Sequence, residues 1–176
     1  ENYLMAREVP FGRLARQITA HFVTRQVFCG AGKVGCELPG RPAAHVPYQL
    51  SQRADFFEEE IGLETTLKRP IVNTRDEPHA EPGSYRRLHV IIGDATLSET
   101  QTFLKLGSLS MFLAAVEDGA LPAPPSLADP VGAVHQRQRE RSVEAVARAD
   151  RVEGLDARHA QAPNGARIGS GDLLGA

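Results

Sequence analysis

The 176-residue sequence has no tryptophan, only two cysteines, and no apolar run near the roughly 20 residues that span a bilayer. Its cysteines, Cys29 and Cys36, have neither the spacing of a CxxC redox pair nor that of a zinc site. No secretory signal peptide is evident at its start. These absences argue against a disulfide-stabilised or membrane-spanning protein, and they predict reduced thiols and a cytoplasmic location.

The charges are nearly balanced, with 20 Lys and Arg residues against 22 Asp and Glu residues and a net charge of −2. Proteins that bind nucleic acid usually carry a basic surface, so no nucleic-acid partner is expected. Hydrophobic residues make up 41% of the chain and charged residues 24%, which is typical of a soluble globular domain. One hydrophobic core is expected at this length, and two are possible.

Polar residues are concentrated between two apolar runs in the middle of the chain. The runs Ile71–Val72 and Leu88–Ile92 are rich in β-branched residues and predict strands, and Pro82–Ser84 marks the connection between them. Residues 73–79 therefore follow directly after a strand. Folding alone seldom requires so many charges in one loop, and this loop is the first candidate site.

The side chains of this loop suit two kinds of chemistry. Arg75 carries a planar guanidinium that matches a phosphate or a carboxylate. Asp76, Glu77 and His79 offer oxygen and nitrogen atoms of the kind that bind Mg²⁺ or transfer protons. The alternative is a solvated loop with local ion pairs, and the spacing alone does not decide between these interpretations.

Two helices are predicted outside this region. Apolar residues recur at helical spacing from Phe11 to Phe22 after Pro10, and a second apolar face, with residues 103, 104, 109, 112, 113 and 116, begins after Ser98 and ends at Gly119. The glycine-rich residues 30–33 lack the spacing of a P-loop and predict a turn between strands. A loop should follow to residue 47, and residues 48–53 should be extended.

Five segments of the sequence together resemble one enzyme family. They are ENYLM at 1–5, TRQV and CGAGKV within 24–34, SQRAD at 51–55, NTRDEPHA at 73–80 and YRRLHVIIGDA at 85–95. In unbroken order to about residue 118, they resemble the Pup-modifying enzymes of actinobacteria, the Dop/PafA family. The resemblance implies an α+β fold, here part of a glutamine-synthetase-like antiparallel sheet with packed helices that binds ATP and Mg²⁺.

The resemblance also implies roles for six side chains. The candidate cofactor ligands are Arg53, Arg75, Arg86 and Arg87, and the candidate metal ligands are Glu77 and His79. Because side chains alternate along a strand, at most one of Arg86 and Arg87 should reach the nucleotide. The family's catalytic aspartate and most of its metal-binding glutamates are expected upstream of Glu1, so the sequence is interpreted as a fragment whose own activity is in doubt.

The segment 56–70 is acidic, and this favours the depupylase branch of the family. Its reaction is hydrolysis at the C-terminal side chain of Pup, either of the glutamine amide or of the isopeptide bond to a substrate lysine. Pup and pupylated proteins are then the expected partners. The alternatives are a Pup–protein ligase, and an inactive remnant or module that only binds Pup or nucleotide.

Resemblance and composition together divide the chain into three expected parts. The resemblance implies a partial catalytic domain over residues 1–118, and the composition predicts a proline-rich connection over residues 119–135. Residues 136–176 contain no Phe, Tyr or Trp and are dominated by Arg, Ala, Gly and Glu. Such a segment buries little apolar surface to offset its ordering entropy, so a loose helix over 141–152 and a disordered tail are expected.

Overall fold

The structure is a computed structural model that describes residues 1–40, 46 and 48–136. It contains helices packed with short strands, which confirms the expected α+β class. The elements are β1 (Asn2–Ala6), α1 (Phe11–Cys29), β2 (Lys33–Val34), β3 (Tyr48–Gln49), a 3₁₀ turn (Ala54–Phe56), β4 (Phe57–Gly62), β5 (Arg69–Asn73), β6 (Tyr85–His89) and α2 (Glu99–Glu117). The helix predicted over 141–152 and the tail beyond it lie outside the described residues.

Helix α1 is longer at its C-terminal end than its apolar pattern predicted. Arg25 and Gln26 interrupt the pattern, yet both are buried on the same side as Phe22 because each finds hydrogen-bond partners inside the protein. The helix ends at Gly30, where a Cβ atom would lie 2.2 Å from the carbonyl oxygen of Leu50. The glycine-rich turn therefore joins a helix to β2, and the expectation of a turn between strands was wrong.

Helix α2 begins and ends where the sequence predicted. The Ser98 side chain caps it by accepting a hydrogen bond from the backbone of Gln101, and Gly119, with a φ of 68°, follows its last turn. Leu109, Leu113 and Val116 are buried as expected. Of the predicted face, the side chains at 103 and 104 are exposed instead, because Lys105 occupies the inward position in that part of the helix.

The strands form three pairs in the described part of the chain. β1 and β6 are antiparallel, with Asn2 opposite His89 and Ala6 opposite Tyr85, and β2 and β3 are also antiparallel. β4 and β5 are parallel, an arrangement that the sequence did not indicate. Residues 63–68 connect them by running back along the pair, a distance of about 20 Å that six extended residues can span.

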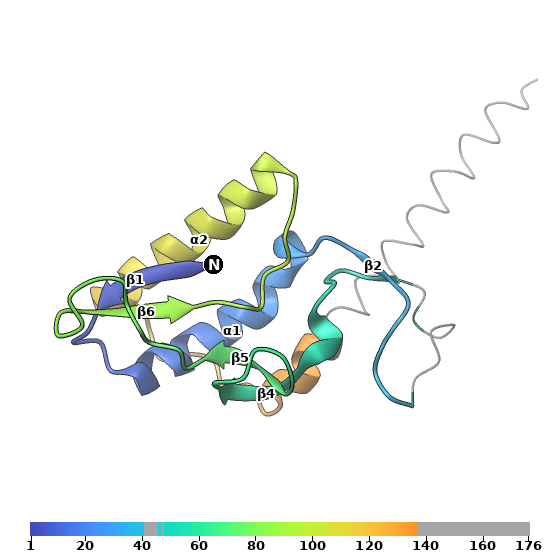
Figure 1. The fold of residues 1–176 in the computed structure, drawn as a ribbon, viewed down its shortest axis with the longest axis horizontal. Coiled ribbons are helices and arrows are strands. Elements are labelled where there is room, and N and C mark those ends of the chain that lie inside the picture. Colours follow the sequence, from blue (N-terminus) through green and yellow to red (C-terminus); the bar gives the residue numbers. More distant parts are fainter. Residues whose placement is uncertain (41–45, 47, 137–176) are drawn as a thin grey trace, which may run out of the picture. The chain divides into compact units, whose positions relative to one another are not determined.

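The hydrophobic core lies between the two helices and the strands. Helix α1 packs against both α2 and β5, and α2 also contacts β1 (Figure 1). Core residues from every layer meet there, among them Met5, Leu14, Ile18, Phe22, Ile71, Leu88, Ile92, Leu109, Leu113 and Val116. No helix in the described ranges is long and apolar enough to cross a membrane.

A candidate anion-binding face on the β1–β6 pair

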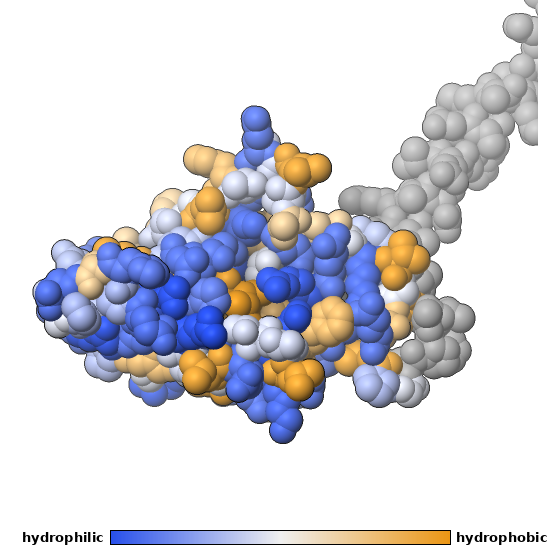
Figure 2. Space-filling view, viewed as in Figure 1, coloured by the Kyte–Doolittle hydropathy of each residue, from blue (hydrophilic) through white to orange (hydrophobic). Residues whose placement is uncertain are grey.

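The β1–β6 pair buries one face and exposes the other. Along β6, Arg86 and Leu88 are buried, whereas Tyr85, Arg87 and His89 point to the opposite, accessible side. This is the alternation that the sequence predicted for the two neighbouring arginines. Figure 2 shows that hydrophilic residues dominate the surface over these strands and over the loop that joins β5 to β6. Arg87 is therefore the member of the pair that can meet a ligand on the accessible side.

The loop after β5 is fixed against this exposed face by charged contacts. Arg7 forms an ion pair with Asp76 and donates two hydrogen bonds to the carbonyl oxygen of Tyr85, at 3.0 and 2.6 Å. Glu77 forms an ion pair with Arg87, with 3.0 Å between Oε2 and Nη2. We call the group of Arg75, Glu77, Arg87 and His89 the arginine face, because two guanidinium groups dominate it.

The arginine face has more positive charge than its own carboxylate can neutralise. The Arg87 side chain is 20% exposed, and its Nε atom, which is itself buried, has no hydrogen-bond partner among the described residues. The guanidinium of Arg75 is exposed and likewise makes no hydrogen bond within that part of the chain; only its backbone N–H is engaged, by Asn73 at 2.9 Å. Unpaired guanidinium donors of this kind bind phosphates and carboxylates strongly.

The titrating groups of the arginine face respond to this charge. The pKa of His89 lies below its ordinary value, first because of burial and then because of the positive charges of Arg87, the N-terminal amine and Arg75. The pKa of Glu77 is also lowered, first by a backbone hydrogen bond at Glu77 itself and then by Arg87. His89 is therefore favoured in its neutral form, in which Nδ1 lies 2.9 Å from the side-chain oxygen of Asn2.

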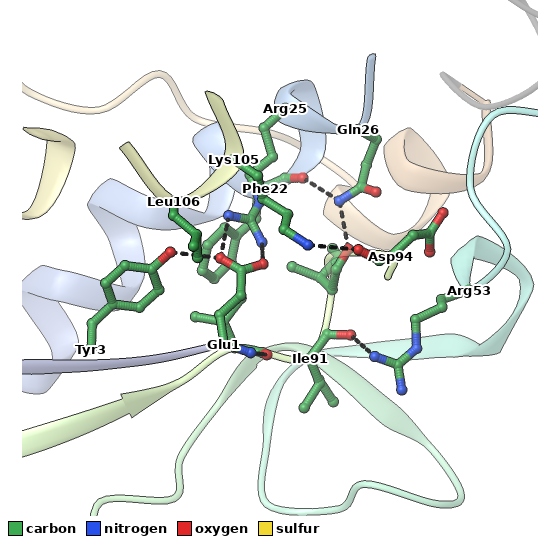
Figure 3. A network of polar contacts seen from close by, with 12 residues as sticks. Glu1, Tyr3, Phe22, Arg25, Gln26, Arg53, Ile91, Asp94, Lys105 and Leu106 are labelled. Atoms are coloured by element: carbon green, nitrogen blue, oxygen red, sulfur yellow. Dashed lines mark hydrogen bonds and ion pairs between the residues drawn. The ribbon is translucent and has the colours of Figure 1, made fainter. Parts of the chain in front are cut away.

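Arg53 lies near the continuation of β6 beyond His89. It donates a hydrogen bond of 2.8 Å to the carbonyl oxygen of Ile91, as Figure 3 shows. Its other terminal nitrogen makes no hydrogen bond with the described residues. Arg53 forms no ion pair with Asp55, which binds Lys33 instead. The pKa of Arg53 is lowered by burial and then by the nearby positive charge of Arg69. The nearby Asp94 carboxylate acts on this pKa in the opposite direction.

Arg86 and His79 lie apart from these groups. Arg86 is 8% exposed on the inner side of the strand, where it stacks near Phe11 and donates to the backbone oxygen of Arg7. His79 is exposed in the loop and forms no hydrogen bond with the described residues. The structure thus brings Arg75, Glu77 and Arg87 together and places Arg53 beyond the end of β6. The other two of the six predicted side chains, Arg86 and His79, lie elsewhere.

The residues that the structure describes do not form a magnesium site by themselves. Over residues 1–40, 46 and 48–136, no three His, Cys, Asp or Glu side chains are grouped so that they could hold a metal ion. Glu77, a predicted metal ligand, is engaged by Arg87. Within the described residues, the arginine face therefore offers donors for an anion but no group of ligands for a metal ion.

A buried polar network beneath the face was not predicted. The Glu1 carboxylate forms an ion pair with Arg25 at 2.8 Å and accepts a hydrogen bond from Tyr3, and Figure 3 shows these groups converging. Burial and the hydrogen bond with Glu1 raise the pKa of Tyr3, which keeps its hydroxyl protonated as a donor. The backbone nitrogen of Glu1 also binds the carbonyl oxygen of Val90, which extends the β1–β6 pairing by one residue.

Asp94 is the second centre of this network. Its carboxylate accepts hydrogen bonds from the backbone of Ala31 and Gln52 and from the Ser51 hydroxyl, at 2.8 to 3.0 Å. Lys105 donates to the backbone oxygen of the same residue. Asp94 therefore holds the segment that carries Arg53 against the end of β6. In the sequence, the sign of this role is a single aspartate after the apolar run 88–92. Sequence alone does not distinguish this aspartate from a surface residue.

Comparison with known proteins gives consistent results. A family model described as Pup-ligase protein matches residues 1–167. The depupylase of Acidothermus cellulolyticus is 62% identical over 134 residues, which cover 76% of this chain and 26% of that protein. The Pup–protein ligase of Corynebacterium jeikeium is 50% identical over 125 residues, covering 69% of this chain and 27% of that protein.

A solved structure has the same fold over most of the chain. The Pup ligase PafA in complex with ADP matches with a TM-score of 0.66 and 41% sequence identity, over 79% of this chain and 30% of that one. The chain thus spans less than a third of the length of each of these relatives.

Proposed function

The chain belongs to the Pup-ligase family, and we propose that its arginine face binds nucleotide phosphates as part of a Pup deamidase or depupylase. The observation that carries this proposal is the pair Arg75 and Arg87, two guanidinium groups of which Glu77 compensates only one. Arg53 adds a third positive charge from beyond the same strand. A polyphosphate is the ligand whose charge and oxygen geometry match such a group.

In this proposal the chain's residues bind and orient rather than perform the chemical step. Hydrolysis of a side-chain amide adds water to the carbonyl carbon, so negative charge develops on oxygen and the leaving nitrogen gains a proton. Arg75 and Arg87 stabilise the negative charge of the bound phosphates. His89 beside them is neutral, so it adds no further positive charge that would repel the two guanidinium groups. Mg²⁺ would supply additional charge neutralisation at the phosphates, but its ligands would have to come from other residues of the family fold.

The depupylase branch is favoured over the ligase branch. The named depupylase is 62% identical to this chain, compared with 50% for the named ligase. The acidic segment 56–70, which includes Glu58 and Glu60 of β4, is the sequence feature that favours the same branch. Pup and pupylated proteins are the partners that we propose, in the cytoplasm, with ATP as the nucleotide.

A chimaera tests this proposal. The matched stretch of the A. cellulolyticus depupylase is replaced by that of this chain, and the product is incubated with Pup ending in glutamine, with a Pup–lysine conjugate, and with ATP and Mg²⁺. We expect deamidation and release of Pup without stoichiometric ADP, because water completes the reaction, and no turnover by the 176-residue chain alone. Net conjugation with one ADP per bond would show a ligase instead.

A further inference from the structure

The loop between β5 and β6, residues 74–84, carries two members of the arginine face. It contains no helix or strand and no Val, Leu, Ile, Met, Phe, Tyr or Trp side chain. A segment that buries so little apolar surface depends on polar contacts for a fixed conformation. At its start, the Asn73 side chain accepts a hydrogen bond of 2.9 Å from the backbone N–H of Arg75, which fixes Arg75 relative to β5. Contacts further along must fix the loop relative to β6.

Arg7, in the turn after β1, makes these contacts at both ends of the loop. Its backbone N–H donates to the Ser84 carbonyl oxygen at 2.9 Å, and its Nε and Nη2 atoms donate to the Tyr85 carbonyl oxygen at 3.0 and 2.6 Å. Its Nη1 atom forms the ion pair with Asp76, the residue after Arg75. All three guanidinium nitrogens of Arg7 thus have partners, and the side chain is committed to the loop.

The planar shape of the guanidinium fixes the two ends of the loop relative to each other. Two nitrogens donate to the carbonyl oxygen at which β6 begins, and the third binds Asp76. An ammonium group has a single nitrogen and could not hold both partners in one fixed geometry. Glu77 follows Asp76 directly and pairs with Arg87, the third residue of β6. Arg7 therefore sets where the loop lies along β6.

We propose that Arg7 is a positioning residue for phosphate binding, which holds Arg75 beside Arg87 and does not itself touch the ligand. This inference rests on the proposed function of the arginine face. Asp76 neutralises the charge of Arg7, so Arg7 adds no net charge to the face. Its effect must come from geometry, because two guanidinium groups bind one polyphosphate only when both direct their N–H groups at its oxygen atoms.

Calorimetric titration of ADP without divalent cations, into the 176-residue chain and its variants, tests this role. Arg7→Lys keeps the positive charge but loses the planar group, and Asp76→Ala removes the partner of Nη1. Each should raise the Kd about fivefold. Asp76→Ala is the sharper case, because loss of a negative charge near bound phosphate would by itself lower the Kd. The control Arg16→Lys alters an exposed guanidinium of α1 in the same way and should leave the Kd unchanged.

Combination with Arg75→Ala distinguishes positioning from a general structural role. If Arg7 acts through Arg75, Arg7→Lys should change the Kd by less than about twofold in the Arg75→Ala background. Backbone hydrogen exchange, measured without nucleotide, should be faster over residues 74–84 in Arg7→Lys than in the wild type, with the exchange of α2 unchanged.

The outcomes separate this inference from the proposed function. If Arg75→Ala raises the Kd but neither Arg7→Lys nor Asp76→Ala does, the positioning role is overturned and the proposed function stands. An equal effect of Arg7→Lys with and without Arg75 would also overturn it, since Arg7 would then act independently of Arg75. So would unchanged hydrogen exchange in residues 74–84. An unchanged Kd for Arg75→Ala would overturn the proposed function itself and the positioning role with it.

Discussion

The Oε2 atom of Glu77 lies 3.0 Å from Nη2 of Arg87, which makes Glu77 the internal counter-charge of the arginine face. In the proposed function, a bound phosphate would compete with this carboxylate for the same guanidinium. The same residue was a candidate metal ligand on sequence grounds, and the two roles predict opposite effects of removing its charge.

Glu77→Gln should therefore strengthen the binding of ADP to the chain. In buffer without divalent cations we expect a roughly three- to fivefold lower Kd by isothermal titration calorimetry, the size of a lost exposed ion pair. Glu58→Gln, at an exposed carboxylate of β4, is the control and should leave the Kd unchanged. A weaker affinity for Glu77→Gln that appears only with Mg²⁺ would contradict this account and support the metal-ligand role.

Stability should fall in acid through His21. Burial lowers the pKa of His21 to about 4 from its ordinary 6.5, and the ring stacks on Phe112 with 4.7 Å between centroids. Below pH 6.5 the unfolded chain binds a proton at this site that the folded chain does not, until about pH 4. Across that interval the loss should be on the order of 1–2 kcal/mol, allowing for solvent screening.

Urea unfolding of the wild type and His21→Phe between pH 8 and pH 4 measures this contribution. The variant preserves the stacking and should match the wild type at pH 8 to within about 1 kcal/mol. Its free energy of unfolding should then decrease less on acidification. An unchanged pH dependence would mean that His21 does not titrate differently in the folded and unfolded states.

Two glycines should respond to alanine in opposite ways. Gly107 lies inside α2 with open space around its Cβ direction, so Gly107→Ala should stabilise the chain by about 0.5–1 kcal/mol through helix propensity. Gly30→Ala should destabilise it by about 2 kcal/mol or more, because the added atom would lie 2.2 Å from the Leu50 carbonyl oxygen. Urea unfolding of both variants checks the signs, and loss of stability in both would show that α2 is frayed at its centre.

Periodic elements could be predicted from the sequence. The start of α1 after Pro10 and the cap of α2 at Ser98 follow from local rules of helix initiation, and both are confirmed. The opposite orientations of Arg86 and Arg87 follow from strand alternation. In each case the signal lies within a few residues of the feature.

Features that depend on distant partners could not be predicted. Arg25 interrupts an apolar pattern and is buried only because Glu1, 24 positions away, neutralises it. The ion pair of Arg7 with Asp76 links residues 69 positions apart. Nor does apolar spacing show whether Phe103 faces the core, because α2 is apolar on both sides and the buried contacts of Lys105 and Gln101 determine its orientation.

We propose that Arg75 and Arg87 together bind nucleotide phosphates. The most direct measurement is calorimetric titration of ADP into the 176-residue chain, the Arg75→Ala/Arg87→Ala variant, and Arg16→Ala, which removes an exposed guanidinium of α1 as the control. The loss of two charge-assisted contacts should raise the Kd at least tenfold in the double variant, with no change in the control. An unchanged Kd in the double variant, or an equal loss in Arg16→Ala, would contradict the account.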